Sequence, residues 1–246
     1  MNITRTRRTG LLSFAVATVA LAGGSLSAQA QLVISQIYGG GGSGLQQAFK
    51  TDGIELFNNG TTAVNVSGYS VQYASATGNF NGIINLPAVS IAAGGYFLIS
   101  TGTVGAGAGN DLASFADLAG STVSLSGTAG KVALVNTTTS LGTVTNPPTG
   151  TTVLDFVGYG ATASAFEGAG PVPAPANITS SIVRNFVGGV YVDTNNNSTD
   201  FVNSRPVVFH KSTGATIQGQ VPSPSALLPF AMGVPMLAMK LRKRRK

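Results

Sequence analysis

An all-β sandwich is the fold class that the 246-residue sequence predicts. Between residues 31 and 220 the chain is rich in Gly, Ser, Thr, Asn, Ala and Val, whereas the helix-surface residues Lys and Glu are scarce. Turn signals recur about every ten residues, which is typical of a sandwich and not of alternating strands and helices. A segment of about 190 residues is long enough for one domain.

The first half of this segment contains short apolar runs separated by glycine-rich turns. Residues 31–38 place Leu32 and Ile34 on one face of a predicted strand, and Val33 and Ser35 on the other. A glycine loop follows at 39–44, and the next strand, 54–58, ends at the turn dipeptide Asn59-Gly60. Further strands are predicted at residues 63–66, 69–73, 83–86, 89–91 and 96–100.

The second half has longer loops. Residues 102–120 are rich in Gly and Ala and predict a loop with one helical turn near 112–118. Residues 123–125 and 131–136 are predicted to pair as a hairpin, and 137–150 to form another loop. The remaining strands are predicted at 153–158, 181–185 and 207–209, and the polar, proline-containing residues 212–224 predict a linker.

Both ends of the chain look like targeting signals. Arg5, Arg7 and Arg8, the apolar run 11–22 and Ala28-Gln29-Ala30 predict a secretory signal peptide over residues 1–30. Near the C-terminus an apolar run at 225–239 precedes six basic residues. As a helix these fifteen residues span roughly 22 Å, less than the roughly 30 Å of a bilayer core. The run therefore predicts a processed membrane segment over 225–246, with an ordinary membrane anchor as the alternative.

Charge and cysteine content exclude several functions. Of the 14 Lys and Arg residues, three lie in the predicted signal peptide and six at the C-terminal end. The five that remain stand against eight acidic residues, so the body carries a net charge of −3. A mildly acidic body gives no electrostatic reason to expect nucleic acid as a partner. With no cysteine, the exported domain has neither disulfides nor thiolate chemistry.

The residues that precede the C-terminal apolar run carry a resemblance. Val221, Pro222 and Pro224 match the Val-Pro-Glu-Pro motif of PEP-CTERM sorting signals, with Ser223 in place of Glu. Pro229 and Pro235 within the apolar run also depart from that pattern. The resemblance implies that an exosortase, a membrane-embedded cysteine transpeptidase, is a partner alongside the secretion machinery. It also implies attachment to the membrane through the C-terminus before processing.

A second resemblance covers the body of the chain. Eight motifs in the same order resemble the bacterial lamin-tail domain family, with Gly53 where an aromatic residue is usual and Tyr69 where Trp is usual. The motifs are VISQIY at 33–38, DGIELFNNG at 52–60, GYSVQY at 68–73, GYFLI at 95–99, GTAGKVAL at 127–134, DFVGYG at 155–160, E-G-x-G-P at 167–171 and SIVR at 181–184. The resemblance implies an immunoglobulin-like β-sandwich over residues 31–211 without a catalytic set. Bacterial members of the family often accompany secreted nucleases or hydrolases.

The best metal-ligand candidate is a polar loop near the end of the domain. Asp193, Asn195, Asn197 and Asp200 offer alternating oxygen side chains, which suit Ca²⁺. The EF-hand pattern fails, because Ser198 stands where it needs Gly and Ser204 where it needs Glu. An Asn-rich turn held by its own side chains is the alternative.

Three other patterns point to structure and not to chemistry. Gly39, Gly41 and Gly44 form G-x-G-x-x-G, but nine residues before the next strand leave no room for a dinucleotide-binding helix. Asp52 and Glu55 are expected on opposite faces of their strand, with Glu55 at the sandwich edge. His210 is the one histidine, which excludes a multi-histidine zinc site.

The sequence thus predicts an exported, non-enzymatic adhesion or scaffold module at the cell surface or in the extracellular matrix, with no cofactor. The first alternative is an accessory module that binds a polysaccharide or a hydrolase, with bound Ca²⁺. The second is a diverged metal-dependent hydrolase, which the shortage of histidine and of clustered carboxylates disfavours.

Overall fold

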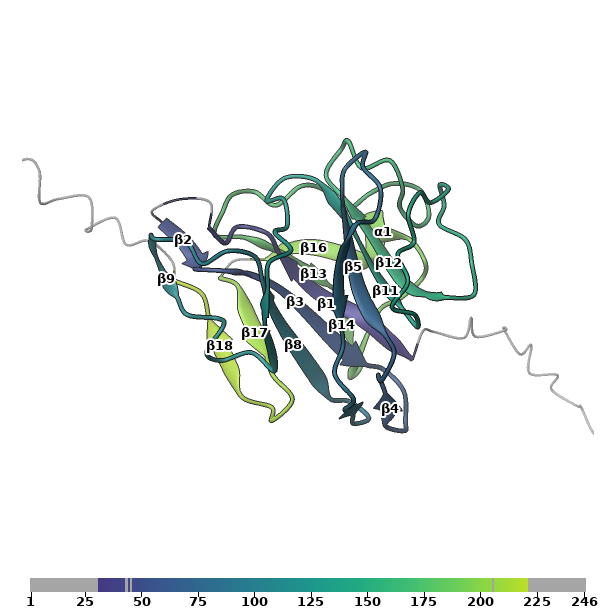
Figure 1. The fold of residues 1–246 in the computed structure, drawn as a ribbon, viewed down its shortest axis with the longest axis horizontal. Helices are drawn as coiled ribbons and strands as arrows, with labels where there is room; N and C mark the ends of the chain where they lie inside the picture. The colour runs from purple at the N-terminus through teal and green to yellow at the C-terminus, as the bar shows by residue number, and fades with distance from the viewer. Residues whose placement is uncertain (1–30, 43, 45, 205, 221–246) are drawn as a thin grey trace, which may run out of the picture.

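Two mostly antiparallel sheets face each other in the computed structural model (Figure 1). The structure describes residues 31–42, 44, 46–204 and 206–220. The larger sheet has the strand order β10 (Leu118–Ser121), β8 (Tyr96–Thr101), β3 (Asp52–Asn58), β1 (Leu32–Tyr38), β13 (Ser181–Arg184) and β16 (Phe201–Ser204). The smaller sheet has the order β12 (Val153–Tyr159), β11 (Gly130–Val135), β5 (Ser70–Ser75) and β6 (Gly82–Asn85). The predicted all-β, immunoglobulin-like sandwich is confirmed.

Alternation of side chains along the strands builds the core between the sheets. Leu56 of the larger sheet and Val132 and Val157 of the smaller sheet belong to one buried cluster. In β1 the alternation is interrupted by a bulge between Ile34 and Gln36. The extra residue allows both Ile34 and Ile37 to face this core, which strict alternation does not allow.

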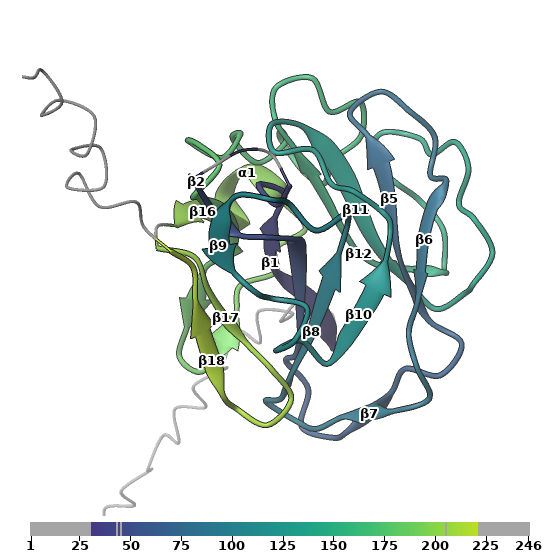
Figure 2. The ribbon, with the colours of Figure 1, turned by 60° about the vertical axis from the view of Figure 1, so that its left-hand side comes forward.

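Four small two-stranded sheets complete the domain. They are β2 (Gln46–Phe49) with β9 (Ala108–Asn110), β4 (Val64–Asn65) with β7 (Ser90–Ile91), β14 (Phe186–Val187) with β15 (Val190–Tyr191), and β17 (Val208–His210) with β18 (Thr216–Gln218). The β17–β18 hairpin lies on the outer side of the larger sheet, away from the smaller one (Figure 2). Its Phe209 packs with Phe49 and Leu98 in a second buried cluster.

Three predicted features differ in the structure, and one is the loop predicted at 102–120, which contains β9 and the first residues of β10. Residues 123–125 form no strand, and β11 pairs instead with β5 and β12, because both neighbours supply full-length antiparallel partners. The strand β18 lies in the predicted linker 212–224, since residues 211–215 form the tight turn of a hairpin. The helical turn near residue 112 is present, with the Ala116 N–H donating to the Leu112 carbonyl.

The predicted terminal signals lie outside the described residues. This applies to the signal peptide over 1–30, to the sorting residues Val221, Pro222 and Pro224, and to the apolar segment 225–246. In the described part of the chain, no helix is long and apolar enough to span a bilayer. The helix found there, α1 (Asn197–Asp200), is a single turn.

Candidate functional site

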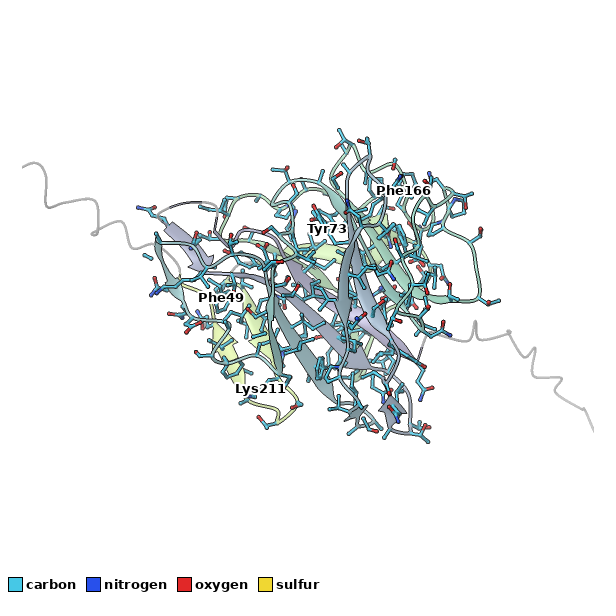
Figure 3. All side chains as sticks on the ribbon, in the orientation of Figure 1. Phe49, Tyr73, Phe166 and Lys211 are labelled. Atoms are coloured by element: carbon cyan, nitrogen blue, oxygen red, sulfur yellow. The ribbon has the colours of Figure 1, made fainter. Side chains whose placement is uncertain are left out.

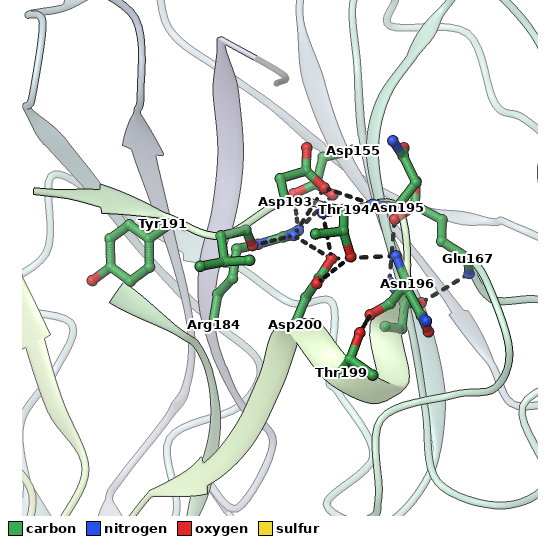
Figure 4. Close-up of polar contacts among 12 residues, drawn as sticks. Asp155, Glu167, Arg184, Tyr191, Asp193, Thr194, Asn195, Asn196, Thr199 and Asp200 are labelled. Carbon is green, nitrogen blue, oxygen red and sulfur yellow. Dashed lines mark hydrogen bonds and ion pairs between the residues drawn. The ribbon is translucent and has the colours of Figure 1, made fainter. Parts of the chain in front are cut away.

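A buried arginine lies among carboxylates in the interior of the sandwich (Figure 4). Arg184, at the end of β13, donates from Nη2 to both carboxylate oxygens of Asp155 at 2.7 Å. Its Nη1 lies 3.1 Å from Oδ1 of Asp193 and 3.7 Å from Oδ2 of Asp200. The guanidinium carbon also lies 4.4 Å from the centre of the Phe201 ring. The fork geometry of Arg suits such two-pronged contacts.

The Arg184–Asp155 pair joins the two sheets of the sandwich. Asp155 lies on β12 of the smaller sheet, and its Oδ2 also accepts the Ile34 N–H of β1 at 2.6 Å. Arg184 Nε donates in turn to the Ile34 carbonyl at 3.1 Å. The side chain points inward because it shares the strand face of Ile182, which packs in the main core. The pair therefore fixes how one sheet sits on the other.

The loop from Asp193 to Asp200 is held by its own side chains. Asp200 accepts the Thr194 N–H at 2.8 Å, the Thr194 hydroxyl at 2.6 Å and the Asn196 N–H at 3.2 Å. Asn195 has a φ of 53°, a left-handed conformation that asparagine tolerates better than most residues. These contacts are those of the Asn-rich turn that the sequence offered as the alternative to a calcium loop.

The structure does not bring the four predicted calcium ligands to one point. Asp193 and Asp200 both approach Arg184, which supplies them with a positive charge. Asn195 is exposed. The buried Asn197 amide turns toward β12, where Nδ2 donates to the Phe156 carbonyl and Oδ1 accepts the Gly158 N–H, each at 2.8 Å. Calcium binding at this loop stays a prediction.

A different set of acids comes together instead. Asp155, Glu167 and Asp193 each place a carboxylate oxygen within 4.8 Å of the other two. Burial, together with the charges of Asp155 and Asp193, raises the pKa of Glu167 to about 8. Burial alone would lower the pKa of Arg184, but Asp155 and Asp193 raise it, so the guanidinium stays charged. The cluster thus has more acidic groups than its one cation can neutralise.

Asp52 and Glu55 lie on opposite faces of β3, as predicted. Asp52 is buried, and its oxygens accept the Gly41 N–H at 2.9 Å and the Leu125 N–H at 2.8 Å. Burial raises its pKa to about 7. Glu55, expected at the edge of the sandwich, lies instead in the third of six strands with its side chain fully buried. The edge prediction was wrong because a hairpin covers the outer face of the sheet at this point.

The glycine loop at 39–44 leads into β2 and not into a helix, which agrees with the exclusion of a dinucleotide site. A Cβ at Gly41 would lie 2.1 Å from the carbonyl carbon of Thr51, so this position has no room for a side chain. His210, the one histidine, lies on β17 with Nδ1 3.1 Å from Oε2 of Glu55. No second histidine exists to complete a metal site with it.

Apolar side chains gather on the outer face beside His210. Tyr96, Phe57, Tyr191 and Phe186 form a chain of ring contacts, with successive centroids 4.8, 5.0 and 4.7 Å apart. Phe186 and Val187 of β14 are 52% and 64% exposed. A cleft of about 410 Å³ borders Tyr96 and is lined in part by Val89, Asp117 and Ser212. The sequence analysis missed this surface, although Gly188-Gly189 between apolar residues is a hairpin signal.

Comparison with known proteins identifies one family. The family model of the lamin tail domain matches residues 25–161. The crystal structure of a DUF4876 family protein from Bacteroides thetaiotaomicron is similar, with 13% sequence identity and a TM-score of 0.49; the match covers 76% of this chain and 74% of that chain. A search of curated proteins finds no match.

Proposed function

Because this chain belongs to the lamin tail domain family, we propose that it is a non-enzymatic adhesion or scaffold module that acts outside the cytoplasm. The family's sandwich is a framework on which loops and hairpins present binding surfaces. Three buried carboxylates hold internal contacts: Asp52 binds two backbone N–H groups, and Asp155 and Asp193 bind Arg184.

The observation that carries the proposal is the exposed apolar hairpin β14–β15. Phe186, Val187 and Val190 are 52%, 64% and 36% exposed, and Phe186 rests on the buried ring of Phe57. Large apolar side chains grouped on a surface mark interaction sites more often than isolated ones do. An anchored hairpin also loses little conformational freedom on binding, which favours affinity.

The binding experiment compares two exposed valines. Purified protein is passed over extracellular matrix and surface polymers from the producing cells, and the retained fraction is measured. Val187→Ser, at a residue 64% exposed, is expected to weaken retention at least severalfold. Val104→Ser, at a residue 67% exposed but remote in sequence from the hairpin, serves as the matched control. Equal retention of the two variants would refute a role for the hairpin.

The proposal includes export and C-terminal sorting. It rests on the signal-peptide pattern of residues 1–30 and on Val221, Pro222 and Pro224 before the apolar segment. An exosortase-like enzyme would then release or transfer the protein at the cell surface. The test is mass spectrometry of the protein recovered from cell envelope and medium. A C-terminus near residue 224 supports sorting, and an intact Lys246 in the envelope indicates a plain membrane anchor.

The second candidate is an accessory module that binds a polysaccharide or hydrolase with Ca²⁺. It is favoured by the three carboxylates of Asp155, Glu167 and Asp193, whose oxygens lie within 4.8 Å of one another. Calcium takes about six to eight oxygen ligands, so these three carboxylates would supply part of the set. Calcium should then raise the melting temperature relative to chelator, and Glu167→Gln should abolish the difference. An unchanged melting temperature in the natural chain would exclude this candidate.

A further inference from the structure

The carboxylate of Glu55 is buried in the larger sheet, where His210 is its ion-pair partner. Its Oε1 accepts the Ser35 hydroxyl at 2.7 Å, and its Oε2 accepts the His210 backbone N–H at 2.6 Å. The same Oε2 lies 3.1 Å from Nδ1 of the His210 ring. Among the ion pairs of the described residues, the one that includes Glu55 is this contact with His210. A buried carboxylate is costly unless it is paired, so the charge of His210 matters to Glu55.

His210 occupies a position from which it can gain and lose a proton. Its ring stacks on Tyr96, with centroids 4.4 Å apart and planes 18° apart. The side chain is 31% exposed, so water reaches it while Glu55 beneath is fully buried. His210 also belongs to the β17–β18 hairpin, whose Phe209 packs into the second core cluster. The imidazole therefore links a small hairpin to the centre of the large sheet.

The other titratable groups around the imidazole either make their polar contacts elsewhere or stay neutral. Lys211, at the turn of the hairpin (Figure 3), places its Nζ 5.0 Å from the centre of the Phe115 ring. Asp117 accepts the Ser212 N–H at 2.9 Å and the Ser212 hydroxyl at 2.6 Å. Tyr96 on β8 stacks on His210, and Tyr191 on β15 lies against Tyr96 with centroids 6.4 Å apart. Burial raises the pKa of both tyrosines, so they stay neutral near pH 7.

We propose that His210 and Glu55 form a pH-sensitive clasp that holds the β17–β18 hairpin against the larger sheet while His210 is protonated and loosens it when the proton leaves. In the protonated state an imidazolium neutralises the buried carboxylate. In the neutral state Glu55 keeps its hydrogen bonds from the Ser35 hydroxyl and the His210 backbone N–H, but its charge is left without a counter-ion. The hairpin then depends on Phe209 and on the Ser212–Asp117 contacts.

The direction of the pH dependence follows from the same contacts. The hydrogen bond from the His210 ring to Glu55 raises the pKa of His210 above 6.5, with burial opposing the rise. A group whose pKa is raised by folding contributes stability that is full below its unfolded pKa and is lost as pH rises through its folded pKa. The clasp is therefore closed in mildly acidic surroundings and opens as the pH rises through the raised pKa of His210. Opening would uncover the apolar seat of Phe209, formed in part by Gly53 and Leu98.

The single histidine makes the titration unambiguous. In the full chain, produced without a histidine tag, the imidazole proton resonances are followed by NMR from about pH 5 to about pH 9. Hydrogen exchange of the peptide covering 208–218 is measured over the same range. The exchange rate is corrected for the intrinsic pH dependence of exchange and normalised to that of the peptide covering β11. We expect a His210 pKa above 6.5 and a severalfold rise in corrected exchange of the hairpin across that pKa.

Two variants separate the clasp from other titrating groups. His210→Gln removes the titration and keeps the backbone bond to Glu55, so the corrected exchange of its hairpin should no longer change with pH. Asp52 and Glu167 titrate in both proteins and cannot produce this difference. Glu55→Gln should lower the pKa of His210. The clasp is refuted if His210 titrates at or below 6.5, or if the hairpin of His210→Gln keeps the pH dependence of the natural chain.

Discussion

The replacement of Asp52 by Asn tests how a buried carboxylate without a counter-ion controls stability. Asp52 is 2% exposed, and its two oxygens accept the N–H groups of Gly41 and Leu125. Neither partner carries a charge, and none of the ion pairs among the described residues includes Asp52. Hydrogen bonds from these two N–H groups favour the charged form, but burial outweighs them.

The expected magnitude follows from the size of the pKa change. Burial raises the pKa of Asp52 from 3.8 to about 7. A shift of about three units corresponds to about 4 kcal/mol. Because the folded pKa is the higher one, this stability is fully present below about pH 4 and is lost as the pH rises through about 7. The free energy of unfolding should therefore depend on pH differently in the natural chain and in the Asp52→Asn variant.

The assay is urea unfolding of natural chain and Asp52→Asn at about pH 4 and about pH 8, with the difference in pH dependence as the readout. At the lower pH the variant should be the less stable by about 1–3 kcal/mol, because the Nδ2 of the new asparagine cannot accept one of the two backbone N–H groups that Asp52 binds. Between the lower and the higher pH, the free energy of unfolding of the variant relative to the natural chain should rise by an amount that approaches about 4 kcal/mol. Other titrating groups cancel in the comparison. Parallel pH profiles for the two proteins would refute the reasoning.

Two further predictions concern the interior. Arg184→Met should lower the free energy of unfolding by about 3–5 kcal/mol, because Asp155 is left buried without its cation. Adding Asp155→Leu should restore most of the loss. An unchanged urea midpoint for the single variant would contradict this. Gly53→Ala should cost about 1–3 kcal/mol by thermal or urea unfolding, since the new Cβ would lie 2.6 Å from the Phe209 ring. Combined with Phe209→Leu the cost of the alanine should fall, whereas strictly additive costs would argue against this contact.

The strands of the two main sheets could be predicted because their burial follows a local pattern. Alternation in residues 31–38 and 54–58 predicts β1 and β3, and the sequence alone locates both within two residues. The failed hairpin at 123–125 has a different origin. Residues 130–135 could pair with 123–125, with β5 or with β12. The local sequence does not say that β5 and β12 are the partners. Strand pairing over long separations is fixed by the whole core.

The sequence predicted only the part of the candidate site whose residues are close together along the chain. Asp193 and Asp200 are close in sequence, and a polar loop is visible from their spacing. Arg184 and Asp155 are 29 residues apart, and the Arg184 bond to Ile34 spans 150 residues. The alternation of Ile182 and Arg184 does predict that the arginine points inward. It does not reveal which of eight acidic residues compensate it, since that depends on the packing of β12 against β1.

Gly53 shows how one substitution connects the fold to its pH response. The lamin-tail resemblance implies an aromatic residue at this position, on the outer face of β3. Here the glycine leaves a gap, and the ring of Phe209 fills it from the β17–β18 hairpin, with a Cβ at Gly53 placed 2.6 Å from that ring. An aromatic residue fixed on β3 would stay in place at any pH. An aromatic residue carried by a hairpin can leave, and the adjacent His210–Glu55 contact places a titratable pair one residue from it. Glycine at 53 is therefore the condition under which a pH-sensitive hairpin can exist on this sheet.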